Sequence, residues 1–169
     1  MICIFEISSS EDPFFKRLIH IDPEQTFEDF HQIIQRTCNF DHSQLASFML
    51  PEAVWRKNIE ITSLDSGKST STLLSMRTTK LNRYLTEIGQ RLMYVFDYFN
   101  DRFLYLELKE ILMKTDLKEP FVAYENGNAP SQFLVNDYNT DMDVLKTEDS
   151  YKSFGDLEDY YEIFGEMDA

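Results

Sequence analysis

Hydrophobic and polar residues alternate at the start of the chain in a way that predicts two strands. Residues 2–8, ICIFEIS, and residues 14–21, FFKRLIHI, carry apolar side chains at alternate positions, which is the period of a β-strand. A polar stretch ending at Pro13 separates them and predicts a turn. The two strands together predict an opening β-hairpin.

The spacing of apolar residues becomes helical after residue 25. One face of the predicted helix carries the apolar residues Phe27, Phe30, Ile33 and Ile34. Thr26 is placed to cap the start of this helix, with Asp29 three residues later in a capping-box arrangement, and Asn39 is placed to end it. A hairpin followed by a helix across one face predicts a β-grasp-like start within an α+β fold.

Residues 91–112, RLMYVFDYFNDRFLYLELKEIL, predict a hairpin at the centre of the sheet. Two runs rich in aromatic and aliphatic residues flank Asn100 and Asp101, a pair that tolerates positive φ and suits a two-residue turn. That turn pairs Phe99 with Arg102, and it places aliphatic pairs on one face and aromatic pairs on the other. Because both faces would be apolar, we expect the rest of the chain to cover both.

The remaining patterns predict weaker elements. Strands are expected within residues 41–50 and 53–62, a loop over residues 63–79, a short helix from Leu81 to Ile88 ended by Gly89, and a short strand at residues 121–124. The sequence therefore predicts one α+β domain over residues 1–136, built on a mixed sheet with the helix of residues 26–38 across it.

Composition changes abruptly in residues 137–169, which carry eleven Asp and Glu against two Lys. Aromatic and aliphatic residues stand between these acids, at helical spacing in the case of Phe154, Leu157, Tyr161 and Phe164. Such a tail is either a solvated terminus or a segment that folds onto a partner or onto its own domain. The apolar stripe favours the second interpretation.

Charge and cysteine usage narrow the class of protein. The formal net charge is −14, and without a basic stripe the chain is a poor direct ligand for nucleic acid, so basic partners are favoured instead. Cys3 and Cys38 have no spacing typical of a metal clip or a disulfide framework. The N-terminus lacks a basic region before its short apolar run, which predicts a cytoplasmic protein without a membrane segment.

Three motifs could carry chemistry, and each has a simpler explanation. Ser8 to Ser10 follow the first strand, where turns favour serine. Gly67-Lys68-Ser69 resembles the end of a phosphate loop, but Thr62 stands where the first glycine should be. The histidines His20, His31 and His42 share no motif, although His31 and His42 could approach each other near Cys38 and Asp41. We therefore predict no catalytic residue, no cofactor and no metal.

Asp97 is the residue whose role most needs an explanation, because a carboxylate within an apolar strand costs free energy unless it is paired. It is either a polar anchor for a ligand at the end of the hairpin or half of a diagonal ion pair with Arg102. The ion pair is the favoured interpretation, since ends of strands host such pairs at little cost.

Four segments resemble the plasmid ORF-three-like family, whose members are often titled insertion-element passenger or resolvase-like proteins. They are ICIFEI, FEDFHQIIQ, DHSQLASF and above all YVFDYFNDR, and together they cover most of residues 1–112. Where the family motif has Gly and a second Asp, this chain has Phe99 and Asn100, and the later Trp and His are absent. The chain looks like a divergent bacterial member with an acidic tail. The resemblance implies no established reaction.

These observations lead us to expect a non-enzymatic, cytoplasmic protein-interaction module with a protein partner. One alternative is an accessory protein of a plasmid or mobile element that acts on DNA through a partner. Another is an enzyme whose site the pattern does not reveal. The candidate binding residues are Asp97, Asn100 and Asp101 at the hairpin turn and Phe154, Leu157, Tyr161 and Phe164 in the tail.

Overall fold

The computed structural model describes residues 1–53, 57–65, 67–113 and 116–134. The chain divides into a unit Met1–Gln132 and a unit Phe133–Ala169, and every helix and strand given below lies in the first. The predicted apolar stripe of the tail, Phe154 to Phe164, lies outside the described residues. Among the described residues, no helix is long and apolar enough to cross a membrane.

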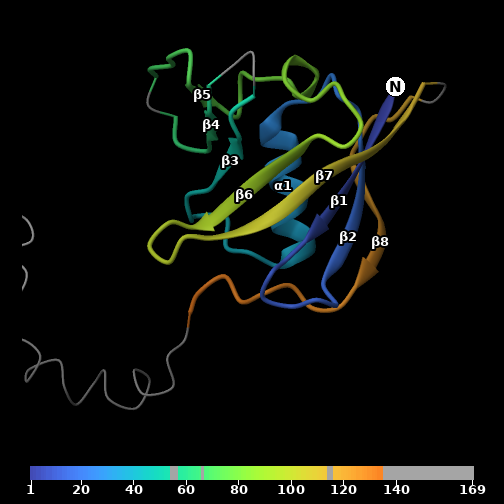
Figure 1. Cartoon of the computed structure of the whole chain (residues 1–169), viewed down its shortest axis with the longest axis vertical. Coiled ribbons are helices and arrows are strands. Elements are labelled where there is room, and N and C mark those ends of the chain that lie inside the picture. The colour runs from blue at the N-terminus through green and yellow to red at the C-terminus, as the bar shows by residue number, and fades with distance from the viewer. Residues whose placement is uncertain (54–56, 66, 114–115, 135–169) are drawn as a thin grey trace, which may run out of the picture. The chain divides into compact units, whose positions relative to one another are not determined.

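The described residues of the first unit form a mixed eight-stranded sheet with one α-helix, so the predicted α+β class is confirmed (Figure 1). In sheet order the strands are β5 (Leu73–Ser75), β4 (Ile59–Thr62), β3 (Ser47–Leu50), β6 (Arg91–Asp97), β7 (Arg102–Leu112), β1 (Ile2–Ser8), β2 (Lys16–Ile21) and β8 (Phe121–Asn126). The β6–β7 hairpin stands at the centre, as predicted. Only β4 and β5 pair in parallel among the described strands.

The opening hairpin and helix form as the sequence predicts. β1 and β2 pair antiparallel, and the helix α1 (Phe27–Cys38) follows them across one face of the sheet. Thr26 and Asp29 form the full capping box, and Asn39 ends the helix with a φ of 56°. A β-grasp fold is not confirmed beyond these elements, since β1 pairs antiparallel with both of its neighbours.

The predicted register of the central hairpin is wrong. Asp97 lies opposite Arg102, and Tyr94 lies opposite Leu104, so the connection is a four-residue turn over residues 98–101. The prediction paired Val95 with Leu106, whereas Leu106 faces Leu92. For Phe103 to Glu107 of β7, the observed partner thus lies three positions earlier on β6 than predicted. Because successive side chains of a strand point to opposite faces, an odd shift changes which side chains of the two strands share a face.

The corrected register leaves the hairpin with one buried face rather than two. That face joins the core under α1 through Leu92, Tyr94, Phe96, Leu104, Leu106 and Leu108. The opposite face carries charged and aromatic side chains such as Arg91, Tyr105 and Lys109, and no described element covers it. Figure 1 looks onto this open face, with α1 behind the sheet. Within the part of the chain that the structure describes, the expected cover is found on one face only.

The weaker elements differ from the prediction in length, and the expected loop is partly ordered. The strand predicted at residues 121–124 is confirmed and extends to Asn126 as β8. Residues 41–50 contain a turn closed by Asp41 and then β3, which confirms the strand predicted there. Among the described residues of the strand predicted at 53–62, only Ile59–Thr62 form a strand, β4. The expected loop contains β5 and the buried Met76. In place of the predicted helix 81–88 there is a single 3₁₀ turn, η1 (Leu81–Arg83). Thus Gly89, although its φ is +90°, ends no helix.

Candidate interaction surface at the hairpin tip

The turn between β6 and β7, residues 98–101, holds an aromatic side chain fully in solvent. Phe99 is 101% exposed and its neighbour Tyr98 is 44% exposed. Asp101 has a φ of 51°, the left-handed conformation that Asp tolerates better than most residues. We call these four residues the hairpin tip. A fully exposed phenylalanine is unusual in a turn that polar residues could form equally well.

The Asp97 carboxylate holds the hairpin tip closed. It accepts hydrogen bonds from the backbone N–H of Asn100 at 3.3 Å and from Nδ2 of Asn100 at 2.9 Å. It also pairs with Nη1 of Arg102 at 3.3 Å. Burial raises the pKa of Asp97, but these hydrogen bonds and the Arg102 charge outweigh burial, so its pKa is lowered. The predicted ion pair of Asp97 with Arg102 is confirmed, with the two residues directly opposite rather than diagonal.

Arg102 is in turn fixed from several sides. Its guanidinium forms a bidentate pair with the Glu11 carboxylate, with Nη2 to Oε1 at 2.8 Å. It donates to the carbonyl oxygens of Ser131 at 2.6 Å and Gln132 at 3.2 Å. Its carbon Cζ also lies 4.9 Å from the centre of the Phe96 ring. A buried arginine with every side occupied has little freedom, so the strand ends that carry the hairpin tip are held in one arrangement.

Aromatic side chains continue from the hairpin tip along the open face. Phe103 and the 45% exposed Tyr105 meet edge to face with ring centres 5.0 Å apart. The Tyr98 hydroxyl is hydrogen-bonded to the Ser47 hydroxyl of β3. Exposed aromatic rings on a rigid sheet are the kind of surface that protein partners bury.

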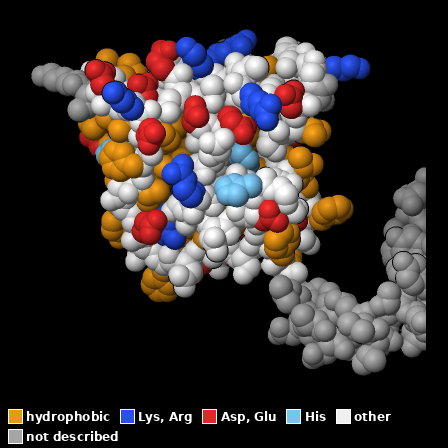
Figure 2. Space-filling model, turned by 180° about the vertical axis from the view of Figure 1, so that it is seen from behind, with side chains coloured by type: hydrophobic (Ala, Val, Ile, Leu, Met, Phe, Trp, Pro, Cys, Tyr) orange, Lys and Arg blue, Asp and Glu red, His pale blue; other side chains and the backbone are white. Residues whose placement is uncertain are grey.

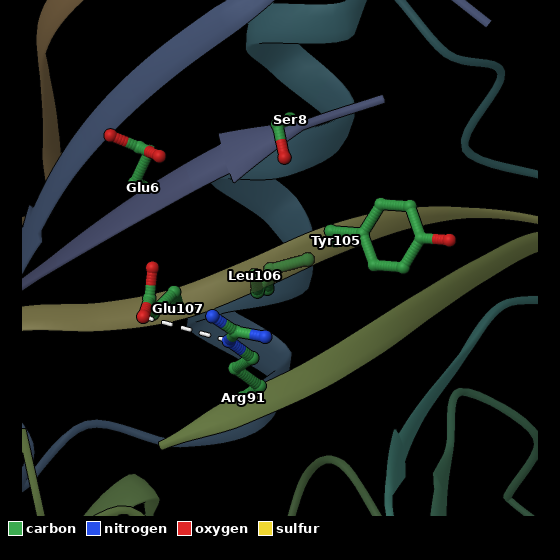
Figure 3. Close-up of a pocket in the computed structure, with 6 residues that line it drawn as sticks. All are labelled: Glu6, Ser8, Arg91, Tyr105, Leu106 and Glu107. Carbon is green, nitrogen blue, oxygen red and sulfur yellow. Dashed lines mark ion pairs between the residues drawn. The ribbon is translucent and has the colours of Figure 1, made fainter. Parts of the chain in front are cut away.

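A shallow pocket of about 220 Å³ lies on the open face beside Tyr105. Figure 3 shows Glu6 and Ser8 from β1, Tyr105 and Glu107 from β7, and Arg91 from β6 around it. The hydrogen bond from Lys109 to Glu107 is the main reason that the pKa of Glu107 is lowered, and Arg91 adds to it with an ion pair at 3.6 Å. Glu6 pairs with Lys16 at 3.5 Å, so both carboxylates that line the pocket are paired within the protein.

The face behind the sheet carries α1 and a buried polar pair. Figure 2 shows this face, with histidine side chains near its centre and hydrophobic side chains mainly toward its edges. Nδ1 of His31 is 2.8 Å from the hydroxyl of Tyr94, and burial lowers the pKa of His31 to about 4. His42 is bonded instead to Gln35 at 3.0 Å. Both histidines thus have hydrogen-bond partners within the protein. Near the end of α1, burial raises the pKa of the Cys38 thiol to about 12.

The structure brings together the three turn residues that the sequence predicted as a site. Asp97, Asn100 and Asp101 meet at the hairpin tip, while Phe154, Leu157, Tyr161 and Phe164 lie outside the described residues. The sequence analysis placed Phe99 within a strand and so did not predict its exposure. It also did not predict the ion pair between Arg102 and Glu11. One signal for the longer turn was Asp97, because Asp is favoured at the first position of a β-turn.

A family model covers most of the chain. The model of the plasmid pRiA4b ORF-3-like proteins matches residues 5–154. The chain belongs to this family. The crystal structure of a protein of unknown function from Methanosarcina mazei Go1 is similar in fold, with a TM-score of 0.60 and 20% sequence identity, over 73% of this chain and 68% of that one. No curated protein matches the chain.

Proposed function

We propose that this protein is a non-enzymatic, cytoplasmic protein-interaction module that contacts its partner through the hairpin tip. The observation that carries the proposal is the full exposure of Phe99 on a turn that Asp97 and Arg102 hold in place. A preorganised aromatic anchor binds without the entropic cost of ordering a loop, which favours its use in recognition.

The gain available from this anchor is large enough to decide an interaction. Burying a phenylalanine side chain contributes about 1.5–3 kcal/mol, and 1.4 kcal/mol corresponds to about a tenfold change in affinity. Phe99 therefore supplies roughly a tenfold to hundredfold difference in Kd when it enters an apolar pocket. Phe103 and Tyr105 would extend the buried area along the open face.

Charge decides what kind of partner fits this surface. Asp101 lies in the same turn as Phe99, and the whole chain carries a formal net charge of −14. An anionic membrane surface would repel such a chain, whereas a protein with an apolar pocket rimmed by Lys or Arg would attract it. The partner that we propose is therefore a protein with a basic rim around an apolar pocket.

The test is affinity purification from the native cell with quantitative mass spectrometry of the bound proteins. We expect the amount of one specific partner recovered with Phe99→Ala to be at least tenfold lower than with the wild type. Its free energy of unfolding should change by less than about 0.5 kcal/mol, because the side chain makes little contact with the fold. Asp97→Asn keeps Phe99 but removes the charge that pairs with Arg102. It should weaken binding of the same partner less than Phe99→Ala does.

Ile88→Ala is the matched control, because Ile88 is 64% exposed in the segment just before β6, away from the hairpin tip. This variant should retain every partner. If Phe99→Ala and Ile88→Ala recover the same proteins in the same amounts, the hairpin tip is not the contact surface and the proposal fails.

The family description names a plasmid open reading frame, which favours a second candidate function. In that case the protein is an accessory factor of a plasmid or mobile element and reaches DNA through its partner. Purified protein alone should then leave duplex DNA unshifted in a gel, and the protein with its recovered partner should produce a salt-dependent shift. A shift by the protein alone would contradict both candidates.

A further inference from the structure

β8 is an edge strand with little protection against pairing. It is the last strand of the sheet, and among the described strands only β2 pairs with it. Three of its six residues, Phe121, Val122 and Tyr124, favour β structure, and none of the six is Lys or Pro. Two features of the strand oppose such pairing, namely a bulge in its pairing with β2 and the charged side chain of Glu125. Among the described residues, no further strand pairs with its outer row of N–H and C=O groups.

A groove runs between this edge and α1. Its volume is about 320 Å³, and it is lined by Ile33, Arg36 and Thr37 from α1 and by Pro120, Phe121, Val122 and Glu125 at β8. The floor is apolar, since Ile33 is buried and Val122 is packed against the core. A groove between a helix and an open sheet edge is the geometry in which extended peptides add a strand and place alternate side chains into pockets.

The charges of the groove distinguish between possible occupants. Glu125 is already engaged, because its Oε1 accepts a hydrogen bond from Thr37 at 2.9 Å and lies 3.9 Å from Nε of Arg17. Arg36 is exposed and has no ion pair or side-chain hydrogen bond with the described residues. The groove thus carries one cation without a described ion-pair partner, Arg36, and one carboxylate that is 58% exposed but pairs with Arg17, so the remaining charge of the groove is positive and complementary to an acidic occupant.

We propose that the groove between α1 and β8 binds an extended, acidic and apolar segment of a partner protein by strand addition to β8. Apolar side chains of that segment pack on Ile33 and Val122, and a carboxylate pairs with Arg36. A second copy that pairs through its own β8 is the less suitable occupant, because the one carboxylate of that strand, Glu125, already pairs with Arg17. This surface is independent of the hairpin tip.

The test uses the isotope-labelled full chain and synthetic seven-residue peptides that alternate Val or Thr with Glu, with blocked ends. We expect the Glu peptide to shift the NMR resonances of the β8 backbone amides. It should also protect these amides from hydrogen exchange. A peptide with Lys in place of each Glu should bind roughly twofold to fivefold more weakly, which is the range of an exposed ion pair. Arg36→Gln should remove this preference, while Arg83→Gln, an exposed arginine at η1, should leave it intact.

A third peptide separates strand addition from simple charge attraction. The Glu peptide N-methylated at alternate residues cannot donate main-chain hydrogen bonds along one edge, so its binding should be lost. Equal binding of the methylated peptide, or shifts that do not include β8, would overturn the proposal. Absence of peptide binding together with a dimer in light scattering would assign the edge to a second copy instead, and would also overturn it.

Discussion

At the scale of single residues, His31 is the side chain whose protonation the fold opposes most clearly. It is 5% exposed under α1 and bonded to the Tyr94 hydroxyl, and burial lowers its pKa from 6.5 to about 4, with a smaller contribution from His42. Between these two pKa values the unfolded chain binds more protons than the folded one. Stability therefore falls as the pH drops from about 6.5 toward 4, and His31 adds no further loss below that window.

We predict a loss on the order of 3 kcal/mol from His31 across that window, at 1.36 kcal/mol for each unit of pKa. The measurement is urea unfolding followed by circular dichroism at several pH values between 7 and 4. His31→Gln should flatten the dependence relative to the wild type. His20→Gln, at the open face of β2, should retain it. Equal slopes for the wild type and His31→Gln would show that carboxylates alone cause the acid loss.

At the scale of elements, α1 is anchored at its start by both local and distant groups. The side chain of Thr26 accepts from the backbone N–H of Asp29 at 3.2 Å, and the Asp29 carboxylate accepts from that of Thr26 at 2.9 Å. The next N–H groups, of Phe27 and Glu28, donate to carbonyl oxygens of the segment between β5 and η1. The unpaired donors that every helix start exposes are thus largely satisfied.

We predict that Thr26→Ala lowers the free energy of unfolding by about 1 kcal/mol, the usual cost of losing a side-chain cap. Asp29→Ala should cost a similar amount, and the double variant should cost less than the two single losses together, because the two side chains serve one capping box. Thr86→Ala, an exposed threonine outside any helix, should change stability by less than about 0.5 kcal/mol. Urea unfolding of the four variants decides the matter, and strict additivity of Thr26→Ala and Asp29→Ala would contradict it.

The central hairpin illustrates why element type is easier to predict than register. The apolar runs of β6 and β7 identified two strands, and Asn100-Asp101 identified a turn. The choice between a two-residue and a four-residue turn depended on Asp97, whose carboxylate bonds to Asn100 and pairs with Arg102. Arg102 takes that position because Glu11 and two distant carbonyl groups hold it there. Local sequence contains no record of those contacts.

At the scale of the whole molecule, charge is divided unevenly between the two parts of the chain. Residues 1–136 carry 19 acids against 14 bases, and residues 137–169 carry eleven against two. Acids alone would serve as a solvated terminus. Because Phe154, Leu157, Tyr161 and Phe164 stand among them, we propose instead that the tail makes a specific contact.

We predict that deleting residues 137–169 changes partner binding, stability or oligomeric state. The three readouts are affinity purification, urea unfolding and light scattering, each on the full chain and on residues 1–136. A chain that keeps the tail but has Phe154, Leu157, Tyr161 and Phe164 replaced by Ser retains the charge and separates the apolar from the electrostatic contribution. If the deletion leaves all three readouts unchanged, the tail acts only as a solvated terminus.

The sequence by itself determined the α+β class, the opening hairpin, α1 with both of its ends, and the central place of the β6–β7 hairpin. Those features follow from the period of apolar residues and from caps within a few residues of each other, which are local properties. Tertiary structure alone decided the hairpin register, the exposure of Phe99, the face of the sheet that α1 covers, and the groove between α1 and β8. Each of these depends on contacts between residues far apart in the chain, such as Arg102 with Glu11 or Thr37 with Glu125, whose free energy no local pattern encodes.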